Sequence, residues 1–278
     1  MPTPPKPSRL PPVPCVLAIG GLDPGGGAGV LADARAIART GALGCAALAV
    51  LTVQSTSGMR SATPVATREL LAECTEVVKH QRVRAIKVGA LGSDDNAAAI
   101  GDFLAIHREV PAVVDTVMVP TRGRARLLEE RAVSVLRDRV LPRAALVTVN
   151  APEAEVLTGR RVTRLDEAHD AALALLALGC RAVLVKGGHL SGPYAVDLLA
   201  TGTRVILFRA RRIRLPPFHG GGCVLASFIA GRVAVTIDAY RDDHERALAN
   251  AVRWAKKLHH AALLKTRDVG GDLRVLLV

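Results

Sequence analysis

Short apolar runs alternate with longer amphipathic segments along this chain, and no other feature of the sequence limits the fold as strongly. The runs are Cys15–Gly20, Gly44–Val53, Arg84–Gly89, Ala112–Val119, Ala145–Val149 and Ala182–Gly187. They have the length of strands, and most lack polar alternation. Strands buried on both faces have this character, so we expect a mostly parallel central sheet with helices on both faces. A chain of 278 residues fits one large α/β domain of this kind.

The segments between these runs have helical spacing. They are Gly27–Thr40, Thr67–His80, Ser93–His107, Glu129–Arg139 and Asp166–Leu178. The rhythm changes where Ala195–Ala200 and Arg204–Phe208 flank Thr201-Gly202-Thr203, which predicts a short antiparallel hairpin at the edge of the sheet. The remaining elements expected are two helices, then a short strand or frayed tail, at about Gly222–Val235, Asp243–Leu264 and Leu273–Val278.

Composition and motif counts exclude several classes of protein. Residues 1–14 hold seven of the 16 prolines, which predicts a disordered tail. No apolar run reaches the 18 or so residues that span a bilayer, and the chain does not open with a signal sequence. The five cysteines are widely spaced without a C-x-x-C pair, so neither a disulfide framework nor a zinc site is indicated. We therefore expect a cytoplasmic protein that does not bind membranes.

The net charge of +12 fits an anionic partner, either nucleic acid or a phosphorylated small molecule. Aromatic residues make up only 3% of the chain, which leaves few side chains to stack on bases and argues against nucleic acid. The segment from Thr203 to Gly222 contains several arginines and no acid, which keeps nucleic-acid binding as a minor alternative. An Arg-rich and Ala-rich composition explains the charge equally well without any function.

A glycine cluster, Gly20–Gly29, directly follows the first predicted strand. It matches a loose dinucleotide fingerprint, but no acid lies between Asp33 and Glu69 to bind a ribose, so NAD binding is not expected. It is also not a Walker A loop, because no Gly-Lys-Ser/Thr follows. The cluster is either a strand-to-helix turn that needs positive φ or a loop that closes over a ligand.

A second cluster, His219–Cys223, precedes the apolar helix predicted from Gly222. Glycines at a helix start let backbone N–H groups converge, which creates a site for an anion. Cys223 would lie in that field, and a helix N-terminus lowers the pKa of a thiol, so its thiolate is a candidate base or nucleophile. The alternative is a buried cysteine with no chemical role.

Five polar or Gly-rich segments follow predicted strands, and the carboxyl ends of parallel strands share one edge of the sheet. They are Gly21–Gly29, Gln54–Thr56, Asp115, Asn150–Glu153 and Lys186–His189. Taken singly, Asn150 could merely cap a helix that starts near Pro152, and Lys186 could be a solvated strand end. Their convergence predicts a ligand site at this edge.

In order and spacing, seven motifs resemble the hydroxymethylpyrimidine/phosphomethylpyrimidine kinases of thiamine biosynthesis, in the ribokinase-like superfamily. They are Leu17–Asp33, Val53–Gly58, Lys87–Leu91, Val114–Met118, Thr148–Ala154, Val185–His189 and His219–Cys223. The resemblance covers roughly residues 15–260. It implies a ribokinase-like kinase domain over residues 15–278 and ATP-dependent phosphorylation of 4-amino-5-hydroxymethyl-2-methylpyrimidine and then of its monophosphate. A homodimer is the assembly we expect.

The resemblance also implies roles for individual residues. In the family pattern the pyrimidine is bound by Asp33 and Gln54, with backbone help from Gly21 and Ala28. The remaining residues would act on ATP and Mg²⁺. Asn150 and Glu153 organise Mg²⁺ and the phosphates, Asp115 and Glu153 ligate the metal, Lys186 neutralises phosphate charge, Gly220, Gly221 and Gly222 form an anion hole, and Cys223 accepts the proton of the substrate hydroxyl.

Three positions depart from the family pattern. Gly221 stands where the family has Thr, and Ala90 stands where a Met packs on the pyrimidine. The flap sequence Ala-Lys-Ser-Gly reads Pro120-Thr121-Arg122-Gly123 here. The departures motivate two alternatives, a kinase for a pyridoxal-like alcohol and a non-catalytic relative that binds pyrimidine or nucleotide.

Overall fold

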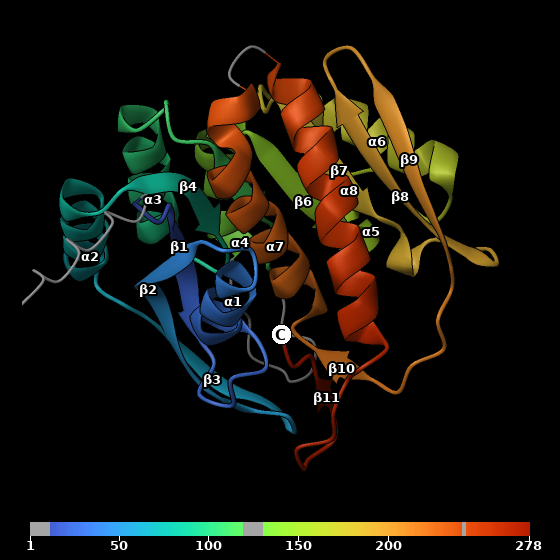
Figure 1. Cartoon of the computed structure of the whole chain (residues 1–278), viewed down its shortest axis with the longest axis horizontal. Coiled ribbons are helices and arrows are strands. Elements are labelled where there is room, and N and C mark those ends of the chain that lie inside the picture. The colour runs from blue at the N-terminus through green and yellow to red at the C-terminus, as the bar shows by residue number, and fades with distance from the viewer. Residues whose placement is uncertain (1–11, 119–129, 241–242) are drawn as a thin grey trace, which may run out of the picture.

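A computed structural model describes residues 12–118, 130–240 and 243–278 of the chain (Figure 1). Four sequence predictions fall wholly or partly outside these residues. They concern the proline-rich tail up to residue 11, the end of the strand predicted to reach Val119, the flap at residues 120–123, and the first residue of the helix predicted over Glu129–Arg139.

Within the described residues, nine strands form one sheet in the order β3-β2-β1-β4-β5-β6-β7-β8-β9. They are β1 Cys15–Leu22, β2 Leu43–Ser55, β3 Gly58–Pro64, β4 Val83–Val88, β5 Ala112–Asp115, β6 Leu146–Asn150, β7 Ala182–Lys186, β8 Tyr194–Thr201 and β9 Val205–Arg211. The six neighbouring strands β2, β1, β4, β5, β6 and β7 are parallel to one another. At the two edges, β3, β8 and β9 are each antiparallel to their neighbours. The mostly parallel sheet and its edge hairpin are confirmed. The second antiparallel edge, β3, was not predicted, because its seven residues contain no apolar run.

Helices cover both faces of the sheet (Figure 1). One face carries α1 Gly29–Ala38, α7 Gly221–Thr236 and α8 His244–Leu263. The other carries α2 Thr67–His80, α3 Asp94–Ile106, α4 Glu130–Val135, α5 Ala151–Thr158 and α6 Leu165–Leu176. None of the helices in the described ranges is long and apolar enough to cross a membrane.

Each face of the sheet has its own hydrophobic core, which explains the continuous apolar runs. In β1, Leu17 and Ile19 pack into the core beneath α2 and α3, whereas Val16 and Ala18 pack into the core beneath α1 and α7. Alternate side chains of a strand point to opposite faces, so a strand covered on both faces needs apolar residues at every position.

The structure shortens one predicted strand and decides the form of the closing segment. Strand β5 ends at Asp115, because its pairing with β6 stops at Thr148 and the Val117 N–H then turns back to the Asp115 carbonyl. The closing segment is resolved in favour of a strand. Strand β11, Arg274–Val275, pairs in parallel with β10, Phe218–His219, and so ties the C-terminal segment to the start of helix α7.

Candidate active site

A cavity of about 1590 Å³ lies at the carboxyl ends of the parallel strands. Pockets for one small ligand have roughly 300–1,000 Å³, so this cavity has room for two. All twelve site residues named from the sequence line it, namely Gly21, Ala28, Asp33, Gln54, Asp115, Asn150, Glu153, Lys186, Gly220, Gly221, Gly222 and Cys223. The prediction that these segments meet at one edge is confirmed, whereas their individual roles stay predictions.

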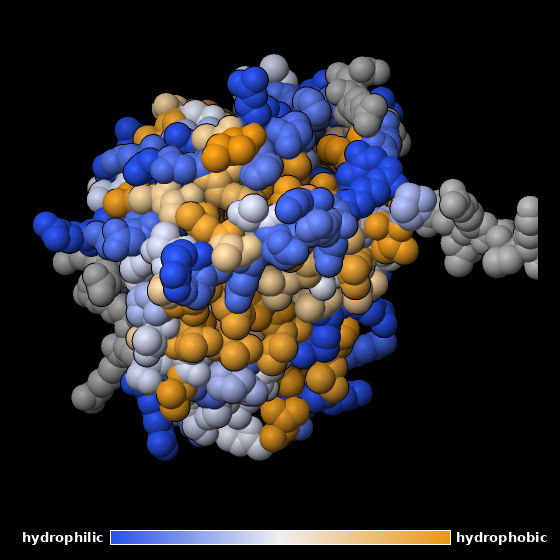
Figure 2. Space-filling model, turned by 90° about the vertical axis from the view of Figure 1, so that its left-hand side faces the viewer, coloured by the Kyte–Doolittle hydropathy of each residue, from blue (hydrophilic) through white to orange (hydrophobic). Residues whose placement is uncertain are grey.

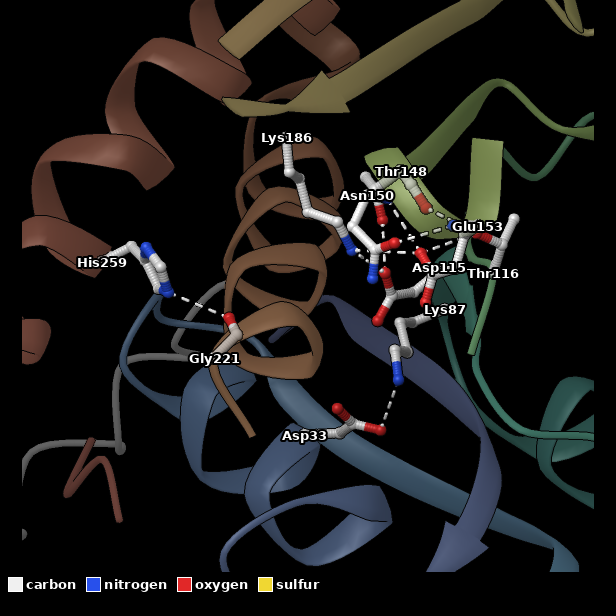
Figure 3. A network of polar contacts seen from close by, with 10 residues as sticks. All are labelled: Asp33, Lys87, Asp115, Thr116, Thr148, Asn150, Glu153, Lys186, Gly221 and His259. Atoms are coloured by element: carbon white, nitrogen blue, oxygen red, sulfur yellow. Dashed lines mark hydrogen bonds and ion pairs between the residues drawn. The ribbon is translucent and has the colours of Figure 1, made fainter. Parts of the chain in front are cut away.

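Lys186 and two carboxylates form a buried charged cluster on one side of the cavity (Figure 3). Lys186 Nζ lies 2.8 Å from Asp115 Oδ1 and 3.9 Å from Glu153 Oε2. Burial alone would lower the pKa of Lys186, but these two carboxylates raise it above its usual value, so the amine carries its charge. Thr148 donates to Asp115 Oδ1 at 2.7 Å. Asp115 Oδ2 is buried and accepts no hydrogen bond from the described part of the chain.

Glu153 is fixed by a capping box at the start of helix α5. The Glu153 N–H donates to Asn150 Oδ1, and the Asn150 N–H donates to Glu153 Oε2, both at 2.9 Å. Thr116 Oγ1 donates to the same carboxylate oxygen at 3.1 Å. Burial raises the pKa of Glu153, and Lys186 opposes this shift. The helix-capping alternative for Asn150 is therefore correct, and the cap also holds Glu153 beside Lys186.

Close packing explains why glycines stand at the start of helix α7. Gly220 has φ +81° and packs so closely on the Gly27 carbonyl that a β-carbon would be 1.9 Å from that oxygen. The two glycine clusters of the sequence are thus in direct contact. A β-carbon on Gly222 would lie 3.3 Å from Lys186 Nζ. The first turn of the helix, whose N–H groups lack partners within the helix, therefore lies beside the positive charge of Lys186.

Cys223 lines the cavity, but its expected activation by the helix start is wrong for this structure. Burial raises the pKa of the Cys223 thiol to about 12, and the negative charges of Asp115 and Asp33 act in the same direction. Lys87 and a backbone hydrogen bond with Gly29 only partly oppose this shift. Loss of hydration is the largest cause of the shift, so the thiol is neutral near pH 7.

The other side of the cavity rests on a buried ion pair that the sequence analysis did not identify. Lys87 Nζ lies 2.8 Å from Asp33 Oδ2, and the two side chains are 1% and 0% exposed. Ser227 donates to Asp33 Oδ1 at 2.8 Å, so both carboxylate oxygens have partners. A lone lysine inside the apolar strand Val83–Val88 was the available signal, because a buried charge needs a counter-charge.

A second polar group links the first glycine loop to strand β10. His219 Nε2 lies 2.7 Å from Gln54 Nε2 and 3.1 Å from Asp23 Oδ2. The Ala28 N–H, expected to help bind the pyrimidine, donates to Asp23 Oδ2 at 2.9 Å. Burial would raise the pKa of Asp23, but its hydrogen bonds from His219 and Ala28 lower it below the usual range. Asp23 thus fixes the glycine loop by accepting a hydrogen bond from its backbone.

Ala90, which stands in place of the family's Met, packs in a small apolar cluster. Met59 of β3 is buried in the same cluster, and Ala62 and Val117 pack against it. Met59 therefore contributes a long apolar side chain close to where the family pattern has one, but from β3 and not from the segment after β4.

Comparisons with known proteins agree with this geometry. The profile of the family described as phosphomethylpyrimidine kinase matches residues 23–274. The hydroxymethylpyrimidine/phosphomethylpyrimidine kinase of Rhizobium meliloti is 38% identical over 249 residues, which cover 89% of each chain. The thiamine biosynthesis bifunctional protein ThiED of Geobacter sulfurreducens is 39% identical over 239 residues, and the match spans 86% of this chain but only 48% of that protein.

Solved structures show the same fold. The pyridoxal kinase of Bacillus subtilis in complex with ADP has a TM-score of 0.84 at 25% identity, covering 95% of this chain and 97% of that one. The phosphomethylpyrimidine kinase of Clostridium difficile has a TM-score of 0.75 at 28% identity, covering 90% and 99%. Since the family profile and relatives above 30% identity cover most of its length, the chain belongs to the phosphomethylpyrimidine kinase family.

Proposed function

We propose that this chain transfers the terminal phosphoryl group of ATP to 4-amino-5-hydroxymethyl-2-methylpyrimidine, and then a second one to the monophosphate, in thiamine diphosphate biosynthesis. Family membership and the named relatives support the reaction. The observation that carries it is the start of helix α7, where Gly222 lies beside Lys186 and Cys223 follows in the same turn. Phosphoryl transfer needs positioning and electrostatic stabilisation, and these groups supply both.

The charged cluster suits Mg²⁺. Asp115 presents a buried carboxylate oxygen with no hydrogen bond in the described structure, and Glu153 is held nearby, with Lys186 paired to both carboxylates. Mg²⁺ in kinase sites is bound by one or two carboxylates together with substrate phosphates. No group of three or more His, Cys, Asp or Glu residues in the described ranges could hold a metal alone, which fits a metal that enters with ATP. Bound there, Mg²⁺ would neutralise phosphate charge.

For Cys223 to accept the hydroxyl proton, its thiol must first lose its own. Burial, Asp115 and Asp33 raise the pKa of the Cys223 thiol, while Lys87 lowers it. A cation held by Asp115 would offset one of the charges that keep this pKa high, and so would favour loss of the thiol proton. The proton that Cys223 then takes up is the one lost by the substrate hydroxyl as its oxygen bonds to phosphorus.

The test is release of ADP that depends on hydroxymethylpyrimidine, with Mg²⁺ and ATP present. Wild-type protein should release ADP only with the pyrimidine, and Cys223→Ala should abolish it. Cys45→Ala is the matched control, since Cys45 is partly buried in strand β2 and does not line the cavity. Absence of pyrimidine-dependent release contradicts the function. Undiminished turnover in Cys223→Ala contradicts the role of Cys223 alone.

A pyridoxal-type kinase is the second candidate. It is favoured by Ala90, which narrows the pocket less than a Met would, and by the structural likeness to the Bacillus subtilis pyridoxal kinase. Rates measured side by side with hydroxymethylpyrimidine and pyridoxal decide between the two. Robust transfer to either alcohol excludes a non-catalytic relative.

The expected homodimer stays a prediction. Figure 2 views the molecule from the side of α2, β2 and β3 and shows apolar side chains gathered on this face. The exposed apolar side chains of β2 are Leu43, Leu51 and Val53. Apolar patches of this kind often mark interfaces, and the mass from light scattering tests the assembly. The cytoplasmic location likewise stays a prediction.

A further inference from the structure

The partly buried His259 connects helix α8 to the start of helix α7, and the proposed reaction gives it no part. Its Nε2 atom lies 2.9 Å from the Gly221 carbonyl oxygen (Figure 3). Burial lowers the pKa of His259 to about 4, and Lys256 and Lys186 act in the same direction. The ring is therefore neutral near pH 7. Because a carbonyl oxygen can only accept, the hydrogen bond assigns the single ring proton to Nε2.

This hydrogen bond determines the direction of a neighbouring N–H group. The Gly221 carbonyl and the Gly222 N–H belong to one planar peptide, which is trans, so they point in opposite directions. Figure 3 shows His259 on one side of Gly221 and the Lys186 cluster on the other. A β-carbon on Gly222 would lie 3.3 Å from Lys186 Nζ and 3.6 Å from Asp115 Oδ2. Holding the carbonyl toward α8 therefore turns the N–H away from α8, to the side of the charged cluster.

The contact with His259 adds order to the first turn of α7, which begins with two glycines after the glycine at its N-cap. Gly220, Gly221 and Gly222 are consecutive, and glycine has the widest choice of φ and ψ. The family pattern has Thr at position 221, but here a β-carbon on Gly221 would lie 2.5 Å from Phe218 Cε2. With the Phe218 ring in this place, position 221 has no room for a side chain that could fix the peptide.

We propose that His259 is a positioning residue, whose hydrogen bond to the Gly221 carbonyl holds the Gly222 N–H toward the phosphoryl group that is transferred. The inference rests on the proposed kinase function. His259 acts through the backbone of helix α7, not on the substrate. Loss of one donor from a hole of this kind lowers kcat by about 10²- to 10³-fold, so a loosened donor should lower it by about 10- to 100-fold.

The test compares His259→Leu with His259→Gln in the full chain. Leu removes the donor, whereas the Gln amide can still donate to the Gly221 carbonyl. We expect His259→Leu to lower kcat by about 10- to 100-fold with little change in the KM for hydroxymethylpyrimidine, and His259→Gln to recover most of the loss. His244→Leu is the matched control, since His244 is an exposed histidine in the first turn of the same helix.

A second measurement separates this role from the proposed function. Affinity is measured for ADP and for ADP with beryllium fluoride, which imitates the transferred phosphoryl group. His259→Leu should weaken binding of the fluoride complex by about 10-fold and leave ADP binding nearly unchanged. Equal weakening of both, an unchanged kcat, or a Gln variant as impaired as Leu overturns the inference. If wild-type protein does not phosphorylate hydroxymethylpyrimidine, the proposed function fails, and the affinities still decide the role of His259.

Discussion

Replacing Lys87 with Met tests whether its ion pair with Asp33 stabilises the floor of the cavity, that is, the side of the cavity where these two residues lie. Lys87 Nζ and Asp33 Oδ2 are 2.8 Å apart, and neither side chain is more than 1% exposed. Two unit charges at that distance attract by roughly 6 kcal/mol at an effective dielectric constant of about 20, and the lost hydration of both groups offsets much of this. Removing one partner leaves the other charge buried without a counter-charge. We expect Lys87→Met to lower the free energy of unfolding by about 3–5 kcal/mol.

The double variant Lys87→Met/Asp33→Asn should be more stable than Lys87→Met, because it leaves no unpaired charge and the Asn oxygen can still accept from Ser227. Urea denaturation followed by circular dichroism at pH 7 measures all three proteins. Arg68→Met is the control, since Arg68 pairs with Glu69 on the surface and water screens that pair. If Lys87→Met costs less than about 1 kcal/mol, or if the double variant is no better than the single one, the ion pair does not stabilise the floor.

Four further predictions follow from the same geometry. Because burial raises the pKa of Cys223 to about 12, its alkylation by iodoacetamide should keep accelerating from pH 7 to pH 10; a plateau near neutrality contradicts this. His259, with its pKa lowered to about 4, stays neutral when folded but binds a proton when unfolded below about pH 6.5, so it removes stability as the pH falls through this range. The melting temperature of His259→Gln should therefore fall less than that of wild type between pH 7 and pH 5, and equal falls refute the assignment. Lys186→Met should lower kcat by at least about 10²-fold in the ADP-release assay, and Lys186→Arg should lower it less. Unchanged turnover would show that Lys186 has no role in the reaction. Gly221→Thr should lower the melting temperature through contact with Phe218, and adding Phe218→Ala should restore part of the loss, whereas no rescue would show that the ring is not the obstacle.

Much of the fold was predictable from local pattern. The six apolar runs gave the parallel strands, because a strand such as β1 that faces a core on both sides needs an apolar residue at each position. The edge strand β3 was missed for the same reason, since most of its side chains are at least partly exposed and it carries no such run. The length of β5 was overestimated because apolar residues continue after its pairing with β6 has ended at Asp115.

The location of the site was also predictable, because parallel strands place their carboxyl ends at one edge. Partners within the site were not. Lys87 and Asp33 are 54 positions apart, and Gln54 and His219 are 165 apart, so no local pattern links them. The contact between His259 and Gly221 depends on how α8 packs against α7, which the sequence of either helix does not specify.

The sequence by itself determined that this chain forms a mostly parallel sheet with helices on both faces. It also determined that the glycine-rich segments meet Asn150, Glu153 and Lys186 at one edge of that sheet. Hydrophobic periodicity and the alternation of strand with helix are local properties, because consecutive residues set them. Only the tertiary structure decided the charge state of Cys223 and the orientation of the peptide after Gly221. Both depend on burial and on groups from distant segments, because hydration is lost and those contacts form only when the chain has folded.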